Sequence, residues 1–368
     1  MTKTNNKKTF LLWLIIFLFS LAICSAFMIP HYTHDTLKMI HSGYTNYTQN
    51  YFIKEARIFS ALLTIIAEII KLPVEAYSIL SFVLAIGFLS YGVVIVYQII
   101  KNALNSVDKR ELLLFIIISY LFVYSYLTIE HIFFLESCIM SLGVLLSVFA
   151  VKIIVENVRY RYVKAIFILC IAVFCYQGSI AIFPMLLLTY YFLLKPLTGK
   201  RKVMVIIKIA FIYGIAMLLT LLYCKFLIGN SRIHINMGMF SLEENLWNLK
   251  YLVIDSLGVI PSFVHLIIVI LTMFSIFIFN QKAKIEKWKL AVNYFLLYLA
   301  SILICMMPVL MGSGLNLTPR MCIAYSQTIS ISLLFLWMIV RKEKCKKNTI
   351  MQILILLVFI TNAYYILF

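Results

Sequence analysis

The chain has 368 residues, of which 64% are hydrophobic and only 12% are charged, and its mean hydropathy is +1.01. A soluble domain would be roughly half apolar and a quarter charged, so this composition excludes a soluble protein. The net charge of +18 does not indicate nucleic-acid binding. The basic residues lie in short gaps between apolar runs, where they retain loops in the cytoplasm and meet anionic lipid headgroups.

Apolar runs long enough to cross a ~30 Å hydrocarbon core recur along the chain. They predict an all-α polytopic transmembrane protein that forms a single integral membrane domain, residues 1–368. About eleven spans are expected, at residues 10–29, 77–99, 112–128, 137–154, 163–176, 179–195, 203–228, 259–279, 290–311, 322–340 and 350–367. The first is expected to remain uncleaved, because its apolar run is longer than that of a typical signal peptide.

Two regions depart from this regular series of apolar spans. The long gap at about residues 30–76 contains apolar residues at helical spacing over 58–70, which predicts a short amphipathic helix lying in the membrane interface. Farther on, Tyr176, Gln177, Gly178, Ser179 and Pro184 interrupt the apolar run from Ala165 to Leu194. This interruption predicts two short helices that meet at one face of the membrane.

Lys and Arg cluster in every second gap, so that one side of the membrane carries about 23 of the 32 basic residues. The positive-inside rule places that side, and the N-terminus, in the cytoplasm and the C-terminus outside. A composition rich in Lys, Asn, Ile and Tyr is typical of an AT-rich bacterial genome. We therefore expect a multi-pass protein of the bacterial cytoplasmic membrane.

The polar residues that are candidates for chemistry all fall on the predicted outer side. His34 and Asp35 follow the first span, and an acid there is either a general base for a sugar hydroxyl or a solvated loop residue. Arg57 either grips a phosphate, lies in the interface, or pairs with Glu55.

Four more segments add candidates on the same side. Glu136 lies near a span entrance, where an unpaired charge is costly, and neighbouring His131 either binds phosphate or caps a helix. Tyr176 and Gln177 either bind a sugar or form hydrogen bonds between helices. Arg320, after Pro319, is a candidate anion site. The cysteines have no zinc-site spacing.

Taken together, these segments resemble the O-antigen glucosyltransferase family of polytopic GT-C-type membrane enzymes. The resemblance covers about residues 30–325. It rests on an acid after the first span followed by Ala56-Arg57-Ile-Phe-Ser, on Phe133-Phe-Leu-Glu136-Ser, on Cys175-Tyr-Gln-Gly-Ser-Ile180, and on Pro319-Arg320. Two positions depart from the family pattern. His34 replaces a first Asp, which leaves no paired acids to support a divalent metal, and Ala56 replaces a Gly.

The resemblance implies a GT-C-like fold and a transferase without a cofactor. Such an enzyme moves a hexose such as glucose from a polyprenyl-phosphate donor to a lipid-linked or cell-surface glycan, outside the cytoplasmic membrane and with inversion. The expected catalytic residues are Asp35, as the base, and Glu136. Arg57, Arg320 and His131 would bind the donor phosphate, and Tyr176, Gln177 and His34 the sugar or acceptor. Membrane lipids, a donor synthase and a flippase are the other expected partners.

Two rival functions remain open on the sequence. A polymerase or ligase of lipid-linked glycan repeats would use Arg and His of a large outer loop, here Arg232 and His234 in residues 229–258. A glycolipid flippase or transporter would not be an enzyme. Such proteins tend to show internal repeats and charged residues at the bilayer midplane, and the sequence has no repeat and almost no midplane charge.

Overall fold

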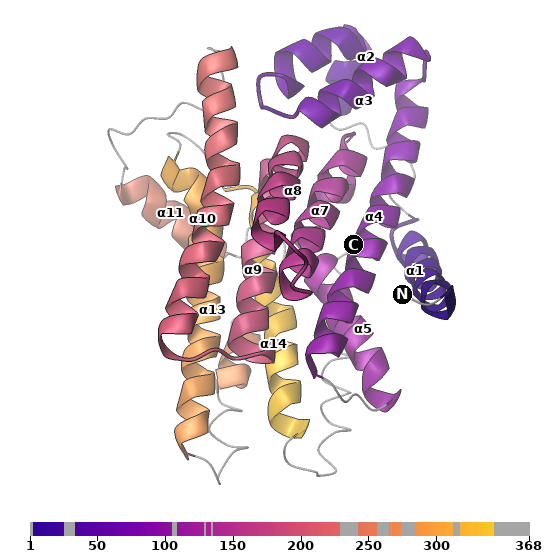
Figure 1. Ribbon diagram of the computed structural model, residues 1–368. Coiled ribbons are helices and arrows are strands. Elements are labelled where there is room, and N and C mark those ends of the chain that lie inside the picture. Colours follow the sequence, from indigo (N-terminus) through magenta and orange to yellow (C-terminus); the bar gives the residue numbers. More distant parts are fainter. Residues whose placement is uncertain are drawn as a thin grey trace.

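A computed structural model of the protein describes residues 3–25, 34–104, 109–128, 130–133, 135–228, 242–255, 265, 267–273, 284–311 and 317–341. In these residues the chain is all-helical and contains no strand (Figure 1). The α-helices are α1 (Lys3–Ile23), α2 (His34–Tyr47), α3 (Ile58–Ile69), α4 (Val74–Leu104), α5 (Lys109–Val123), α6 (Glu130–Phe133), α7 (Ser137–Val155), α8 (Arg161–Cys175), α9 (Ile182–Thr189), α10 (Gly199–Tyr223), α11 (Leu242–Val253), α13 (Lys284–Met311) and α14 (Ile323–Arg341). Short 3-10 or π-helical segments are η2 (Thr48–Phe52), η3 (Gln177–Ala181), η4 (Tyr190–Leu194), η5 (Cys224–Ile228) and η7 (Pro319–Met321).

Six helical stretches among the described residues are long and apolar enough to cross a membrane, as expected for a helical membrane protein. They are Asn6–Ile23, Val74–Leu104, Ser137–Val155, Gln177–Leu194, Gly199–Leu227 and Trp288–Met307. The predicted spans 112–128 and 322–340 correspond to the shorter apolar helices Glu111–Val123 and Ile323–Met338, and the span 163–176 corresponds to the 15-residue α8. The predicted spans 259–279 and 350–367 lie largely or wholly outside the described residues.

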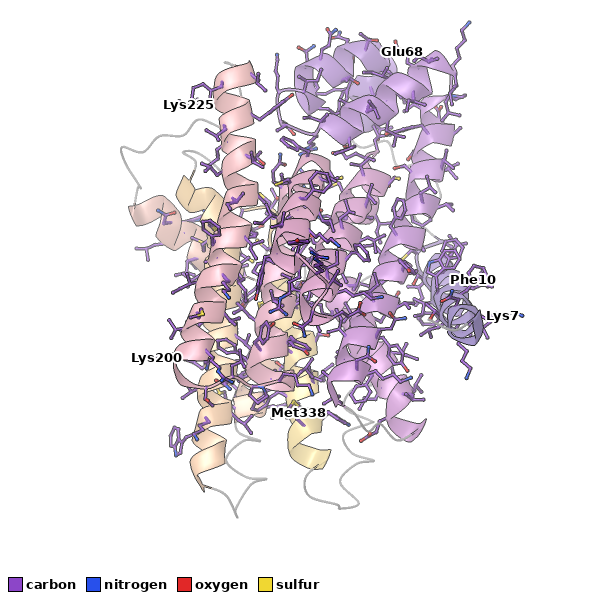
Figure 2. The ribbon with its side chains drawn as sticks, viewed as in Figure 1. Lys7, Phe10, Glu68, Lys200, Lys225 and Met338 are labelled. Carbon is purple, nitrogen blue, oxygen red and sulfur yellow. The ribbon has the colours of Figure 1, made fainter. Side chains whose placement is uncertain are left out.

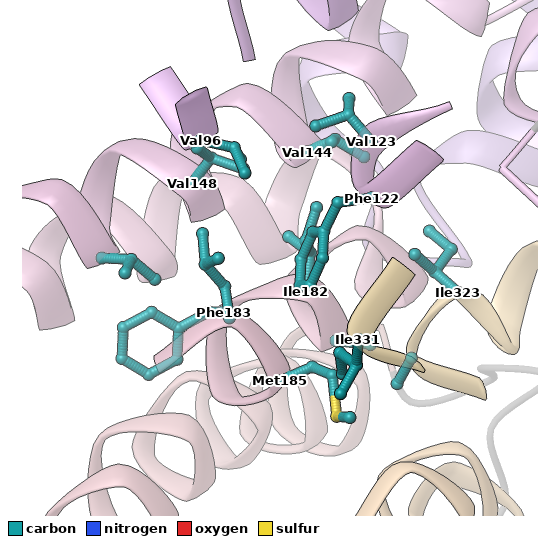
Figure 3. Packing of buried hydrophobic residues seen from close by; sticks show 14 of the residues in the cluster. Val96, Phe122, Val123, Val144, Val148, Ile182, Phe183, Met185, Ile323 and Ile331 are labelled. Atoms are coloured by element: carbon teal, nitrogen blue, oxygen red, sulfur yellow. The ribbon is translucent and has the colours of Figure 1, made fainter. Parts of the chain in front are cut away.

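The centre of the bundle is the contact between α4 and α7, which run in the same direction. Ser81 Oγ lies 3.0 Å from Ser137 Oγ near their N-terminal ends, and Lys152 Nζ donates to Gln98 Oε1 (3.1 Å) near their C-terminal ends. Valines pack between these points, including Val96 against Val148 (Figure 3). Because lipid tails are as apolar as the core, close packing and hydrogen bonds hold such helices together.

Basic residues lie close together at the end of the bundle where α4 and α7 have their C-termini. Arg161 Nη1 donates to the Ile154 carbonyl (3.3 Å), Lys208 Nζ lies 5.0 Å from the centroid of the Tyr162 ring, and Lys202 bonds to Asn293. The structure thus gathers basic residues from α4, α7, α8 and α10 at a common end. Figure 2 shows Lys200 toward this end and Glu68 at the opposite end.

Opposite the basic end, α2, η2 and α3 form a layer over α7 and α8, beside the N-terminal part of α4 (Figure 1). The predicted helix at 58–70 is confirmed as α3. Its buried residues are small or hydroxylated (Ser60, Ala61, Thr64 and Ala67), whereas Leu62, Ile65, Ile66 and Ile69 are exposed. A hydrogen bond between the Thr48 and Thr64 hydroxyls (2.6 Å) joins η2 to α3. This layer holds the segment that carries Arg57.

The predicted interruption at 176–178 is also confirmed. Helix α8 ends at Cys175, and Tyr176 is extended (φ −163°, ψ 126°) before η3 and α9 continue the chain. The turn fits closely against α7, because Ser179 Oγ donates to the Met140 carbonyl (2.8 Å). A Cβ on Gly143 would lie only 3.0 Å from Ser179. The interruption therefore places Tyr176 and Gln177 at the junction of α7, α8 and α9.

Candidate functional site

Arg57 is presented by a tight turn between η2 and α3. The Arg57 N–H donates to the Phe52 carbonyl (2.8 Å), and Ala56 adopts a left-handed conformation with φ 57°. Glycine reaches that region without strain, whereas a residue with a Cβ does so at a cost. The turn directs Arg57 away from solvent, and its side chain is only 12% exposed.

Two carboxylates meet the Arg57 guanidinium. Nη2 lies 2.8 Å from Glu55 Oε2, and Nη1 pairs with Glu136 Oε1 from the residue that precedes α7. Burial lowers the pKa of Arg57, but Glu136 and Glu55 more than offset this effect and hold the pKa above its ordinary value. The group therefore remains a cation, and its pairing removes the large cost of an isolated buried charge.

Tyr176 and Gln177 complete the surroundings of Arg57 from the interruption after α8. The guanidinium carbon lies 5.1 Å from the centroid of the Tyr176 ring, at cation–π distance. Gln177 Nε2 donates to the Glu55 carbonyl (2.8 Å). The polar residues that break the apolar run thus fix the turn that presents Arg57.

His131 and Arg320 lie on the other side of Tyr176. The His131 and Tyr176 rings meet edge to face, with centroids 5.2 Å apart. His131 Nε2 donates to the Arg320 carbonyl at 3.2 Å. Burial lowers the pKa of His131 to about 3, so the imidazole is neutral at pH 7. A neutral imidazole that donates through Nε2 has an acceptor at Nδ1.

Gly178 allows η3 and η7 to come this close. A Cβ at this position would lie 2.6 Å from the Tyr176 ring and 2.8 Å from the Arg320 carbonyl oxygen. Both distances are shorter than real Cβ contacts. The glycine is therefore required by the close approach of the segment carrying Arg320 to the segment carrying Tyr176.

Several polar side-chain atoms near this centre are buried and have no hydrogen-bond partner among the described residues, including Arg57 Nε, His131 Nδ1 and Thr318 Oγ1. Buried polar groups in folded proteins are nearly always hydrogen-bonded, so these atoms are candidates for contacts with a ligand. Arg57 Nε–H is a charged donor suited to a phosphate oxygen. His131 Nδ1 is an acceptor suited to a hydroxyl.

Of the eight predicted site residues, the structure brings six together: Arg57, His131, Glu136, Tyr176, Gln177 and Arg320. The other two, His34 and Asp35, form the first turn of α2, and their side chains lie outside the described part. Arg232 and His234, the residues of the polymerase alternative, also lie outside it.

Glu55, Gly178 and Thr318 belong to the site but were not among the predicted site residues. Glu55 was expected only as a possible partner that would make Arg57 structural, yet it binds Arg57 together with Glu136. Its position two residues before Arg57 was the available signal. Gly178 could be recognised only as part of the interruption, because the carbonyl that approaches it belongs to a segment more than 140 residues away.

No protein-family model, curated protein or solved structure matches this chain.

Proposed function

We propose that the protein is a membrane glycosyltransferase that moves a sugar from a polyprenyl-phosphate donor to a glycan acceptor outside the cytoplasmic membrane. The observation that carries the proposal is the convergence of Arg57, Glu136, Tyr176 and His131 with the Arg320 segment. These residues come from separate parts of the chain and supply charged, aromatic and hydroxyl-accepting groups in one place.

The turn at Ala56 adds support. The resembled family has a glycine where this chain has Ala56, and Ala56 adopts the left-handed conformation that glycine accommodates best. The backbone at this position thus has the shape that the family's residue would favour. The left-handed turn gives a physical reason for this part of the resemblance, because it directs the arginine that follows it into the protein.

In the proposed reaction, an acceptor hydroxyl attacks the anomeric carbon of the donor sugar while the bond from that carbon to the phosphate oxygen breaks. Asp35 takes the hydroxyl proton, and the electron pair of the broken bond leaves with polyprenyl phosphate. The attack comes from the face opposite the phosphate, so the configuration inverts. Arg57 Nε–H and the Arg320 guanidinium stabilise the charge that grows on the leaving phosphate.

The remaining residues position these groups. Glu136 and Glu55 hold the Arg57 guanidinium in a fixed orientation, and preorganised charges of this kind stabilise a transition state without rearranging. His131 Nδ1 accepts a hydrogen bond from a sugar hydroxyl, a role that its neutral imidazole suits better than the predicted contact with phosphate. Tyr176, Gln177 and His34 line the sugar or acceptor site.

The proposal includes the finer topology expected from the sequence: a GT-C-like fold with eleven spans, the N-terminus in the cytoplasm and the C-terminus outside. The common basic end of α4, α7, α8 and α10 supports it, because basic loops are retained in the cytoplasm. The site lies near the opposite end, beneath the layer of α2 and α3. Nucleotide sugars are not available on that outer side, whereas a lipid-linked donor is.

The proposal is tested by measuring transfer of radiolabelled sugar from polyprenyl-phosphate donors by the purified protein in detergent. We expect transfer by the unchanged protein and a 10²–10⁴-fold loss in Asp35→Asn, the usual effect of removing a general base. Glu136→Gln should lower the rate as well, because it loosens Arg57. Glu68→Gln, which changes an exposed acid on α3, serves as the matched control and should remain active.

Each variant that loses activity must still elute from size-exclusion chromatography as a single monodisperse peak, because a misfolded variant would also be inactive. Full activity of Asp35→Asn would contradict the assignment of the base. Failure of the unchanged protein with several donor sugars would contradict the transferase itself. Chain growth from a lipid-linked repeat that depends on Arg232 and His234 would then identify a polymerase.

A further inference from the structure

A second polar region lies far from the candidate site, beside the C-terminal part of α4. A cavity of about 340 Å³ opens between α1, α4 and the residue that follows α7. Its walls include Lys8, Thr9 and Leu12 from α1, and Tyr97, Gln98 and Lys101 from α4. The volume is in the range of sites that hold small molecules.

The charge in this cavity is predominantly positive. Lys8 and Lys101 come from different helices, and neither forms an ion pair within the part of the chain that the structure describes. Glu156 is the acid of the lining, but Lys152 Nζ lies 3.9 Å from it and offsets its charge. Two exposed ammonium groups facing one cavity favour an anionic ligand.

Hydrogen bonds give the cavity a defined wall. Gln98 Nε2 donates to Thr9 Oγ1 at 3.4 Å, which connects α4 to α1, and Gln98 Oε1 accepts from Lys152 at 3.1 Å. Lys101 Nζ lies 5.8 Å from the centroid of the Tyr97 ring. The Gln98–Thr9 bond joins the lysine-bearing faces of α1 and α4, and the other two contacts fix the side chains on the α4 side of the cavity.

The surface next to the cavity is apolar. Phe10 and Leu11 of α1 are 61% and 57% exposed, and Ile15 one turn farther along is 57% exposed. Figure 2 shows Phe10 and Lys7 on α1 at the edge of the bundle. A ligand that occupies the cavity with an anionic head therefore has an exposed apolar helix beside it, along which hydrocarbon chains can lie.

We propose that this cavity binds the phosphate headgroup of an anionic phospholipid, with the acyl chains packed along α1. Only 11% of the apolar stretch of α1 is buried, so a lipid bridging Lys8 and Lys101 would attach this helix more firmly to α4. The cavity lies at the basic end of the bundle. By the positive-inside rule, that end faces the cytoplasmic leaflet, where anionic lipids are attracted to basic residues.

Native mass spectrometry of the full-length protein in detergent, with added phosphatidylglycerol, tests this proposal. We expect one phosphatidylglycerol to bind more tightly than phosphatidylcholine. Each lysine near a membrane surface contributes enough to change binding about fivefold, so Lys8→Gln with Lys101→Gln should weaken binding about 30-fold. Lys200→Gln with Arg201→Gln removes the same charge elsewhere on the basic end and should change it little.

Glu156→Gln is expected to act in the opposite direction and to tighten phosphatidylglycerol binding, which no misfolded variant would do. Equal affinity for phosphatidylcholine would overturn the proposal. So would equal weakening by the two double variants, because the charge would then act through the whole basic end. Saturable binding of inorganic phosphate that displaces the lipid would show a free-phosphate site instead.

Discussion

Arg57 is a buried cation that two carboxylates and an aromatic ring surround. An ionised group taken out of water is costly unless it is paired and hydrogen-bonded, and Glu136, Glu55 and Tyr176 meet this requirement. Such a pair often adds little net stability, although breaking it is strongly destabilising. These three residues therefore fix the position of the Arg57 guanidinium and contribute little net stability to the fold.

The buried side chain of His131 makes the free energy of unfolding depend on pH. Its folded-state pKa of about 3 lies below the ordinary value of 6.5, so as the pH falls through 6.5 the unfolded chain takes up a proton that the folded protein excludes. The contribution of this histidine to stability is therefore present above pH 6.5 and decreases as the pH falls toward 3. At pH 5 the loss is about 2 kcal/mol.

The free energy of unfolding in detergent, measured at pH 7.5 and pH 5, checks this prediction. His131→Gln should lose less stability between these two values than the unchanged protein, because glutamine does not titrate. His41→Gln, which alters an exposed histidine of α2, should lose as much as the unchanged protein. An undiminished pH dependence in His131→Gln would contradict the argument.

At the scale of single helices, α3 reverses the usual arrangement of a helix in a water-soluble protein. Its small and hydroxylated residues pack inward against α2, η2 and α8, and Leu62, Ile65, Ile66 and Ile69 face outward. Small residues allow close approach between helices, whereas an exposed apolar stripe suits the membrane interface. The same helix thus packs on the turn carrying Arg57 and presents an apolar face to its surroundings.

The contact between η3 and η7 depends on the absence of a side chain at Gly178. Gly178→Ala should force the Tyr176 ring or the Arg320 carbonyl to move. We expect the free energy of unfolding to fall by about 1–3 kcal/mol, which is typical of overpacking. Gly214→Ala is the matched control, since a Cβ there meets nothing within 4 Å inside α10. It should stabilise the helix by about 0.5–1 kcal/mol. Thermal unfolding in detergent that ranks the two variants equally would contradict this interpretation.

At the scale of the whole molecule, the bundle has two ends of different character. Basic residues of α4, α7, α8 and α10 gather at one end, and the layer of α2 and α3 covers the other (Figure 1). The candidate site lies beneath that layer, at the end that the proposed orientation places outside the cytoplasm. The lysine cavity beside α4 lies at the basic end.

This arrangement predicts which surfaces are accessible from outside the cell. Glu68→Cys, at the tip of the α2–α3 layer, should react with a membrane-impermeant thiol reagent in intact cells. Lys200→Cys, toward the basic end (Figure 2), should react only after lysis. Both variants are made in a Cys345→Ser background, which is the control, because Cys345 lies outside the described residues and the other cysteines are buried or half-buried. Labelling of Lys200→Cys in intact cells would reverse the proposed orientation.

Local pattern was sufficient to predict an all-helical membrane protein and several of its helices, although not α2. Apolar runs longer than the hydrocarbon core is thick, together with basic residues in alternate gaps, predicted an all-α membrane protein. The helical spacing at 58–70 predicted α3, and the polar interruption at 176–178 predicted the break after α8. These predictions succeed because helix formation and insertion into lipid depend on short-range periodicity and hydrophobicity.

Residues that face each other across the bundle could not be paired from sequence. Arg57 and Glu136 are 79 positions apart, and His131 and Arg320 are 189 apart. Six residues that the fold brings together were recognisable in the sequence, but the pairing of Arg57 with Glu55 was left open and the need for glycine at Gly178 was not apparent. These contacts are visible only in the folded chain, because they depend on how separate helices pack, and packing is set by the shapes of all the side chains between them.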